Sequence, residues 1–146
     1  MNERFLFRGR RYDNGEWITG WITSQFKKFT EGEVLTYIKS NVFGCGEHLV
    51  NTKTVGQCTG LKDKNGKLIF EGDIVESRAS ENKEDWKRWV VQFTDGSFCF
   101  EREIPRKRKY KYEQNLLGID NIELYGLTVT GNVYDNLELL QRSEDE

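Results

Sequence analysis

Residues 59–75 constrain the fold of this chain most, because two turn signals there stand beside short apolar segments. Asn65-Gly66 takes the positive φ angles of a tight hairpin turn at little steric cost. Gly72-Asp73 repeats the signal, and Ile74-Val75 begins a β-branched segment. Leu68-Ile69-Phe70 leaves room for only a short strand between the two turns. These residues predict a strongly bent β-structure.

The same turn chemistry predicts two further hairpins. Asp13-Asn14-Gly15 separates an alternating segment, residues 4–9, from residues 17–22, in which Gly20 is expected to mark a bulge. Asp95-Gly96 separates residues 89–93 from the aromatic segment that follows, and this pattern predicts a second hairpin. Alternation of apolar and polar residues within these segments is typical of half-buried strands.

Other segments carry weaker signals. Residues 34–38 alternate like a strand, while residues 24–32 and 41–47 are polar or rich in glycine and predict loops. Residues 49–59 indicate an irregular or weakly extended segment. Residues 80–85 fit either one capped turn of helix or a solvated loop.

The last third predicts two more elements and their connections. Residues 112–120 fit a short helix, and residues 124–129 fit a strand. Gly131-Asn132 predicts a turn, and residues 135–140 a helical turn capped by its first or second residue. The predicted barrel core consists of Ile69, Ile74, Val75, Val90, Phe93, Val129 and Val133. Trp89 or Val91 should be partly exposed, with Gly72, Gly96 and Gly131 at the turns.

Composition bounds the classes of protein that fit. The 146 residues include 13% aromatic and 32% charged residues, with a net charge of −2, so no global field attracts nucleic acid. The three cysteines, Cys45, Cys58 and Cys99, form no Cys-x-x-Cys pair and are expected to be reduced. No apolar run is long enough for a signal peptide or a membrane span, so we expect a cytoplasmic protein.

Several acidic and nucleophilic residues are candidates for catalysis. Asp63, Glu71 and Asp73 lie close in sequence and could hold Mg²⁺ for a metal-dependent hydrolase. An aspartate in a turn more often accepts backbone N–H groups, so the structural role is favoured. Cys45 and the single histidine, His48, have the spacing of a dyad only on a helix, and the flanking glycines disfavour one. We therefore predict no catalytic, cofactor-binding or metal-binding residue.

A basic segment is the candidate binding site. Its cations and rings would track phosphates and stack on bases, or would contact an acidic protein surface. A solvated loop is the structural alternative. The candidate residues are Arg102, Arg106, Lys107, Arg108, Lys109, Tyr110, Lys111 and Tyr112.

Several motifs resemble the YopX family of small proteins encoded by phages and bacterial prophages. The motifs are Phe5-Leu6-Phe7-Arg8, Thr54-Val55-Gly56-Gln57, residues 59–67 with 69–75, and Gly131-Asn132-Val133-Tyr134-Asp135-Asn136 with Leu139-Leu140. The resemblance covers nearly the whole chain and implies an SH3-type barrel in its later part. It also implies a bacterial cytoplasm and a role in replication or host interaction, but no catalytic or ligand residues. Cys58 departs from the family, whose members often carry an aromatic residue there.

The sequence therefore predicts a mainly β protein with one or two short helical turns. Residues 1–58 form an N-terminal β-hairpin lobe, residues 59–140 an SH3-like barrel or roll, and residues 141–146 a disordered acidic tail. We expect a non-enzymatic accessory protein that needs no cofactor and binds an unknown phage or host macromolecule. Nucleic-acid binding through residues 102–112 is the first alternative, and a metal-dependent hydrolase is the second. No membrane partner is expected, and a homo-oligomer is compatible with this architecture.

Overall fold

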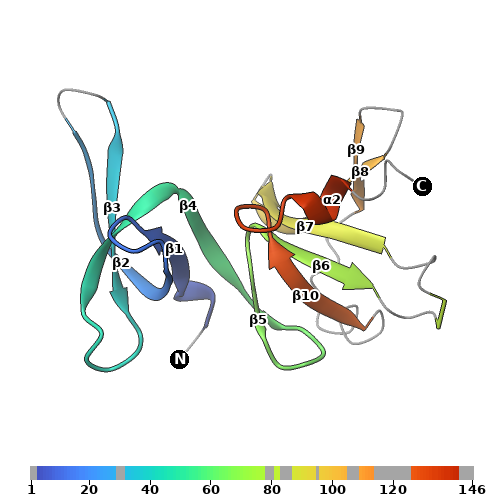
Figure 1. Cartoon of the computed structure of the whole chain (residues 1–146), viewed down its shortest axis with the longest axis horizontal. Helices are drawn as coiled ribbons and strands as arrows, with labels where there is room; N and C mark the ends of the chain where they lie inside the picture. Colours follow the sequence, from blue (N-terminus) through green and yellow to red (C-terminus); the bar gives the residue numbers. More distant parts are fainter. Residues whose placement is uncertain are drawn as a thin grey trace. The chain divides into compact units, whose positions relative to one another are not determined.

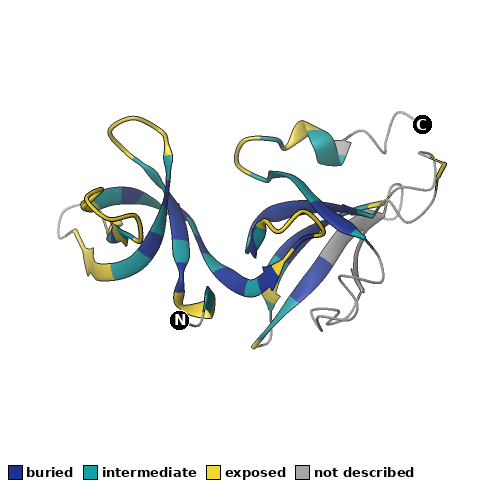
Figure 2. Ribbon diagram, turned by 90° about the horizontal axis from the view of Figure 1, so that it is seen from below, coloured by how far each residue is buried: buried dark blue, intermediate teal, exposed yellow. Residues whose placement is uncertain are grey.

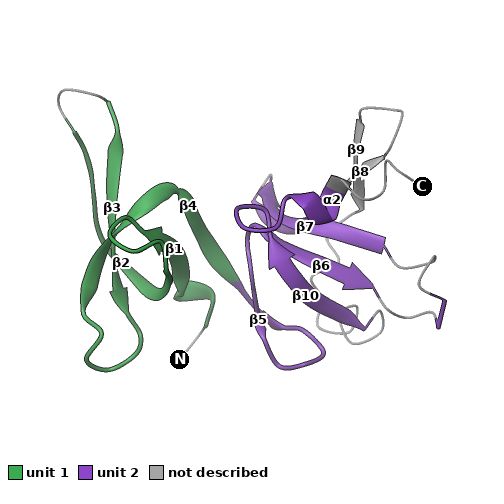
Figure 3. Ribbon diagram, in the orientation of Figure 1, with its two compact units in different colours: residues 1–58 green, residues 59–146 purple. Residues whose placement is uncertain are grey.

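The computed structural model describes residues 3–28, 32–77, 81–82, 87–94, 96–104, 109–113 and 126–141. The chain is mainly β, as predicted, with strands in two antiparallel sheets. It divides into two compact units, Met1–Cys58 and Thr59–Glu146 (Figure 3). In chain order (Figure 1) the elements are η1 (Glu3–Phe5), β1 (Phe7–Arg11), β2 (Trp17–Lys27), β3 (Val34–Ser40), β4 (Glu47–Lys62), β5 (Leu68–Phe70), β6 (Asp73–Ser77), β7 (Lys87–Thr94), β8 (Ser97–Ile104), β9 (Lys109–Glu113), β10 (Leu127–Asn132) and α2 (Glu138–Gln141).

The first unit is a ring of strands. β1 pairs with β2, β2 with β3, β3 with β4, and β4 returns to pair with β1, every pairing being antiparallel. The buried side chains of Ile18, Ile38 and Val50 form its core. Partly buried Phe7, Ile22 and Val55 pack against them. The sequence predicted barrel closure for the later part of the chain, whereas here the first unit closes through β1 and β4.

Two glycines allow this ring to close tightly. A Cβ atom at Gly9 would lie 2.8 Å from Val50 Cγ2, so a larger side chain would collide with the core. A Cβ atom at Gly20 would overlap the backbone carbonyl oxygen of Lys39 on β3. Gly20 was expected to mark a bulge, but the irregular register between β2 and β3 lies between Ile22 and Ser24. Its role is close backbone approach.

Residues 49–59, which were expected to be irregular or weakly extended, are extended in the regular strand β4. The segment lies within a sixteen-residue strand, whose pairing with β1 breaks between two regular stretches. Inside the break, the Thr54 hydroxyl accepts a hydrogen bond from the Arg10 N–H at 2.9 Å and donates to the Asn51 carbonyl at 2.6 Å. Side-chain oxygens thus replace ladder bonds where the backbone bulges.

Other boundaries also differ from the predictions. Phe5 belongs to the 3₁₀ turn η1 and is exposed, so the first strand begins only at Phe7. β2 continues to Lys27 through residues that were expected to form a loop. The hairpin turn at Gly15 and the strand beginning at Val34 are confirmed.

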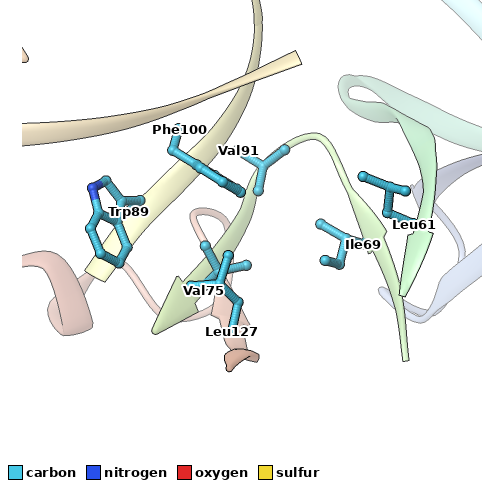
Figure 4. Packing of buried hydrophobic residues seen from close by; sticks show 7 residues of the cluster. All are labelled: Leu61, Ile69, Val75, Trp89, Val91, Phe100 and Leu127. Atoms are coloured by element: carbon cyan, nitrogen blue, oxygen red, sulfur yellow. The ribbon is translucent and has the colours of Figure 1, made fainter. Parts of the chain in front are cut away.

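The second unit holds a five-stranded sheet in the order β10-β6-β7-β8-β9, while β5 pairs with β4 in the other sheet. Its buried core joins residues from six strands (Figure 4). The core residues are Leu61, Ile69, Val75, Trp89, Val91, Phe100 and Leu127. Either Trp89 or Val91 was expected to be partly exposed, but both are buried, and Phe93, a predicted core residue, is 47% exposed. Alternation correctly placed Trp89 and Val91 on the same face of β7. That face is buried around these two residues, where partial exposure was expected.

Both faces of β6 and β7 are buried nevertheless. Ile74 and Val90 are register partners on the opposite face from Val75 and Trp89, and all four are buried. On that opposite face, the short helix α2 is tied to β7 by a hydrogen bond from Arg88 Nη1 to the Leu139 carbonyl at 3.1 Å. Figure 2 shows buried residues along the strands and exposed ones in the turns.

The turn predictions for this unit are largely confirmed. Gly66, Gly72 and Gly96 have φ of 83°, 89° and 82°. Gly131 instead lies within β10, where the register with β6 is irregular and the Asn136 side chain fills the space a Cβ would need. The SH3-like character of this unit stays a prediction.

Some predictions lie wholly or largely outside the described residues. These are the segment 80–85 apart from residues 81 and 82, the helix over 112–120 apart from residues 112 and 113, and the tail after Gln141. Gln141 itself, which was assigned to the tail, is the last residue of α2. No helix among the described residues is long and apolar enough to cross a membrane.

Candidate functional site

Asp63 is a buried carboxylate that organises backbone. Its Oδ1 accepts hydrogen bonds from the Asn65 and Lys67 N–H groups at 2.8 and 2.9 Å. Its Oδ2 accepts a third from Val129 N–H on β10 at 3.0 Å. Three donors occupy a side chain that is 6% exposed, so this carboxylate ties the β4–β5 turn to β10.

Asp73 plays a similar role in the next turn. Its Oδ2 accepts a hydrogen bond from Phe70 N–H at 2.8 Å, and its side chain is 1% exposed. Glu71 lies in the turn between these residues and is partly exposed. Within the described ranges, no three His, Cys, Asp or Glu side chains are grouped so that they could hold a metal ion. Asp63 and Asp73 therefore accept backbone N–H groups in two successive turns.

His48 and Cys45 meet through the backbone. His48 Nε2 lies 2.6 Å from the Cys45 carbonyl oxygen, so the ring contacts the main chain of residue 45. Cys45 is exposed in the loop before β4, whereas the other two free cysteines, Cys58 and Cys99, are buried. The imidazole therefore helps to fix the backbone of the loop that carries Cys45.

The basic segment forms a hairpin in its described part. β8 and β9 pair with Arg102 opposite Lys111 and Ile104 opposite Lys109, while Glu103 stands opposite Tyr110. The described backbone therefore places basic residues of the segment opposite one another on paired strands. Arg106, Lys107 and Arg108 lie outside the described residues.

The loop of residues 41–46, here called the Phe43 loop, carries apolar residues that sequence analysis overlooked. Phe43 is fully exposed and Val42 is 59% exposed. Neither residue belongs to a strand or an alternating pattern, so their exposure could not be read from periodicity. The only sequence signal was an apolar pair beside Gly44 and Gly46, whose φ values are 85° and 71°.

A second exposed apolar surface lies on the projecting β2–β3 hairpin (Figure 1). The rings of Phe26 and Tyr37 stack with centroids 6.0 Å apart and planes inclined by 21°. Tyr12 donates a hydrogen bond to Glu33 Oε1 at 2.9 Å. This hydrogen bond is the main reason why the pKa of Tyr12 is raised above its usual value, with burial a smaller contribution.

Cations and an aromatic ring meet on β1 and β2. The guanidinium carbons of Arg8 and Arg10 lie 5.0 and 5.8 Å from the centre of a ring of Trp17. Arg8 is largely buried, and both guanidiniums make cation–π contacts with the indole. These contacts stabilise the ring of strands. Nearby, Arg11 holds the pKa of Asp13 below its usual value through a side-chain hydrogen bond.

Comparisons with known proteins agree with the fold. Of solved structures, the crystal structure of protein EF1440 from Enterococcus faecalis is similar, with a TM-score of 0.52 and 24% sequence identity. The match covers 92% of this chain and 96% of that one, and it shows a shared fold. No curated protein matches significantly. Residues 6–141 match the family described as YopX protein. Because this match spans most of the 146 residues, the chain belongs to the YopX family.

Proposed function

We propose that this chain is a phage- or prophage-encoded accessory protein that binds a macromolecule, a host or phage protein, without catalysing a reaction. One contrast carries the proposal. The groups that could do chemistry, Asp63, Asp73 and His48, contact the chain's own backbone, whereas the first unit exposes apolar side chains. The exposed residues are Phe5, Tyr12, Phe26, Val34, Val42 and Phe43. Val42 and Phe43 are consecutive and both exposed, and exposed apolar side chains that lie together are typical of interaction surfaces.

Small β-structures commonly present loops and sheet edges to partners and carry no chemistry of their own. A bacterial cytoplasm is the proposed compartment, because it keeps thiols reduced and Cys45, Cys58 and Cys99 are all free. The YopX assignment supports the phage or prophage origin as an expectation of the family.

The test is quantitative affinity purification of the tagged chain from cells that encode it, at several salt concentrations. Recovery of a stoichiometric protein partner that binds the purified chain directly is the expected result. Failure to recover any partner, together with turnover of an ester, peptide or phosphodiester substrate by the purified chain, would refute the proposal.

Nucleic-acid binding through residues 102–112 is the second candidate. The observation that favours it is the β8–β9 pairing, which sets Arg102 opposite Lys111 and brings basic residues of two strands together. Binding should weaken steeply with salt, because each phosphate contact releases counterions. Replacing Arg106, Lys107, Arg108 and Lys109 together with alanine should abolish binding while the circular dichroism spectrum is unchanged. If the wild-type chain shifts neither DNA nor RNA at low salt, this candidate is excluded.

A further inference from the structure

The Phe43 loop holds its exposed residues in a defined position. At one end, Ser40 Oγ accepts a hydrogen bond from Val42 N–H at 3.0 Å. Across the loop, Cys45 N–H donates to the Val42 carbonyl at 3.2 Å, and Ser40 N–H donates to the Gly46 carbonyl at 2.8 Å. Asn41 N–H donates to the Thr19 carbonyl on β2 at 3.0 Å.

These bonds join the loop to two strands and to itself. A side chain presented from such a loop loses little conformational freedom when it binds, which favours affinity. Phe43 is therefore exposed and at the same time preorganised. An exposed phenylalanine on a mobile tail would lack this advantage.

The charges around the loop indicate the kind of partner. Residues 41–46 include no charged side chain. At the base of the loop, Lys39 and Glu47 are register partners of opposite charge, and both are exposed. The nearby Arg11–Asp13 ion pair, 2.6 Å long, is likewise neutral as a pair. Phosphates of nucleic acids and anionic lipid surfaces both require an excess of cations, which these surroundings lack.

A neutral, apolar surface instead fits the centre of a protein–protein interface, where charged residues are depleted and aromatic residues are enriched. A phenylalanine alone buries on the order of 150–250 Å², well below the roughly 1,200 Å² of a small stable interface. Phe43 must then act as an anchor within a wider contact.

We propose that Phe43 inserts into an apolar pocket with an uncharged rim on a partner protein, with Val42 packing against the rim. This inference rests on the proposed function, because it names the residues through which the chain binds. It predicts that affinity depends on Phe43 far more than on other exposed phenylalanines.

The test begins with a label at Cys45, the exposed cysteine two residues from Phe43. Benzophenone maleimide attached there is photolysed with the proteins of cells that encode the chain, and the adduct is identified by mass spectrometry. The partner is then purified and titrated with unlabelled chains. Phe43→Ala should weaken binding about thirtyfold or more, as truncation of an interface hot spot does. Phe43→Leu should weaken it less.

Phe5→Ala is the matched control, because Phe5 is also exposed but lies in η1. It should change affinity less than threefold, as expected away from a hot spot. Unchanged circular dichroism of Phe43→Ala establishes that the variant folds. Anionic phosphatidylglycerol vesicles and a short DNA duplex serve as probes of the other partner classes.

Four results would overturn the inference. A partner that binds Phe43→Ala as tightly as the wild type refutes the anchor but leaves the proposed function standing. A photoadduct with a second copy of the chain would show that the Phe43 loop contacts its own kind instead of a different partner protein. Phe43-dependent binding to vesicles or DNA refutes a protein pocket. Failure to obtain any partner, by affinity purification or by photolysis, refutes the inference, and turnover of a substrate by the same purified chain then refutes the proposed function as well.

Discussion

The two units of this chain differ in how their strands are paired and in which faces of their sheets are buried. The first unit closes four strands into a ring around a small apolar core that includes Ile18 and Val50. The second unit keeps a sheet in the order β10-β6-β7-β8-β9 and buries both faces of β6 and β7. Closure removes free edges where the four strands pair around the ring, whereas a sheet with two buried faces needs cover on each side.

The difference appears in the residues that each unit depends on. The ring needs residues without side chains, because Gly9 and Gly20 lie where strands approach closely. The second unit needs buried acidic side chains, because Asp63 and Asp73 accept backbone N–H groups and Glu76 pairs with Arg88. Four substitutions test this contrast, and peptide-resolved hydrogen exchange can assign the first three effects to a unit.

Gly20→Ala should have the largest effect. Its Cβ atom would overlap the Lys39 carbonyl oxygen, and the backbone of β2 or β3 must shift. We expect a loss of about 4 kcal/mol in the free energy of unfolding, confined to the first unit. Gly15→Ala is the control: it has a φ of 72° but open space around it, so about 1 kcal/mol is expected. Equal losses in the two variants would contradict the role assigned to close approach.

Arg88→Met should have the next largest effect. Arg88 Nε lies 2.6 Å from Glu76 Oε2, and the Glu76 side chain is 3% exposed, so the variant removes a cation from a buried carboxylate. A loss of about 3 kcal/mol is expected in the second unit, with faster exchange in α2.

Arg11→Met provides the comparison, because Arg11 Nη2 lies 2.6 Å from Asp13 Oδ2 and Asp13 is 62% exposed. Urea denaturation should detect no change in the stability of that variant. If Arg88→Met and Arg11→Met lose similar free energies of unfolding, burial of the carboxylate does not determine how much each ion pair stabilises the fold.

Asp63→Asn should have a smaller effect. The amide keeps one acceptor oxygen, but its NH₂ group must face a backbone N–H donor from either Asn65 and Lys67 or Val129. We expect a loss of about 2 kcal/mol in the second unit, measured by urea denaturation. In the first unit Asn14 Oδ1 accepts from Glu16 N–H at 3.0 Å in an exposed turn, and Asn14→Ala should cost less than about 0.5 kcal/mol. The reverse order would show that turns in the ring also depend on buried side chains.

Tyr12→Phe should have the smallest effect, visible only at high pH. The folded-state pKa of Tyr12 is raised above 10.0, chiefly by its hydrogen bond to Glu33. A group with a raised folded pKa stabilises the fold fully below its unfolded pKa, and the contribution is lost as pH rises through the folded value. The urea midpoint should therefore fall less above pH 10 in Tyr12→Phe than in the wild type. Parallel curves for the two proteins would exclude a contribution from this bond.

The parts predicted correctly from sequence are those set by local chemistry. Gly15, Gly66 and Gly96 lie in turns because an Asn or Asp beside a glycine tolerates positive φ angles. Residues 49–59 gave only a weak prediction of extended structure, because the strand bulges near Thr54 and its apolar alternation breaks there. The alternation of residues along β7 placed Val91 and Phe93 on one face, but only Val91 is buried. The point at which burial ends along the strand depends on strands that are distant in sequence.

The candidate site was harder to predict. A turn role for Asp63 followed from its position beside Asn65-Gly66, and the backbone hydrogen bonds confirm it. Phe43 stands outside any periodic pattern, and its exposure depends on loop contacts with β2 that no local rule contains. Pairing of β8 with β9 sets Arg102 opposite Lys111, and composition alone cannot reveal such a register.

The return of β4 to β1 also bears on the order of folding events. Phe7 pairs with Gln57, so the ring joins the first and the last residues of its own unit. On a ribosome, which delivers the chain from its N-terminus, β1 and β2 can form their hairpin early but must wait for β4 before the ring closes. Until then the outer edge of β1 offers a row of backbone donors and acceptors to any neighbouring strand. Slow synthesis of residues 47–57 would prolong this interval and raise the yield of aggregated chains.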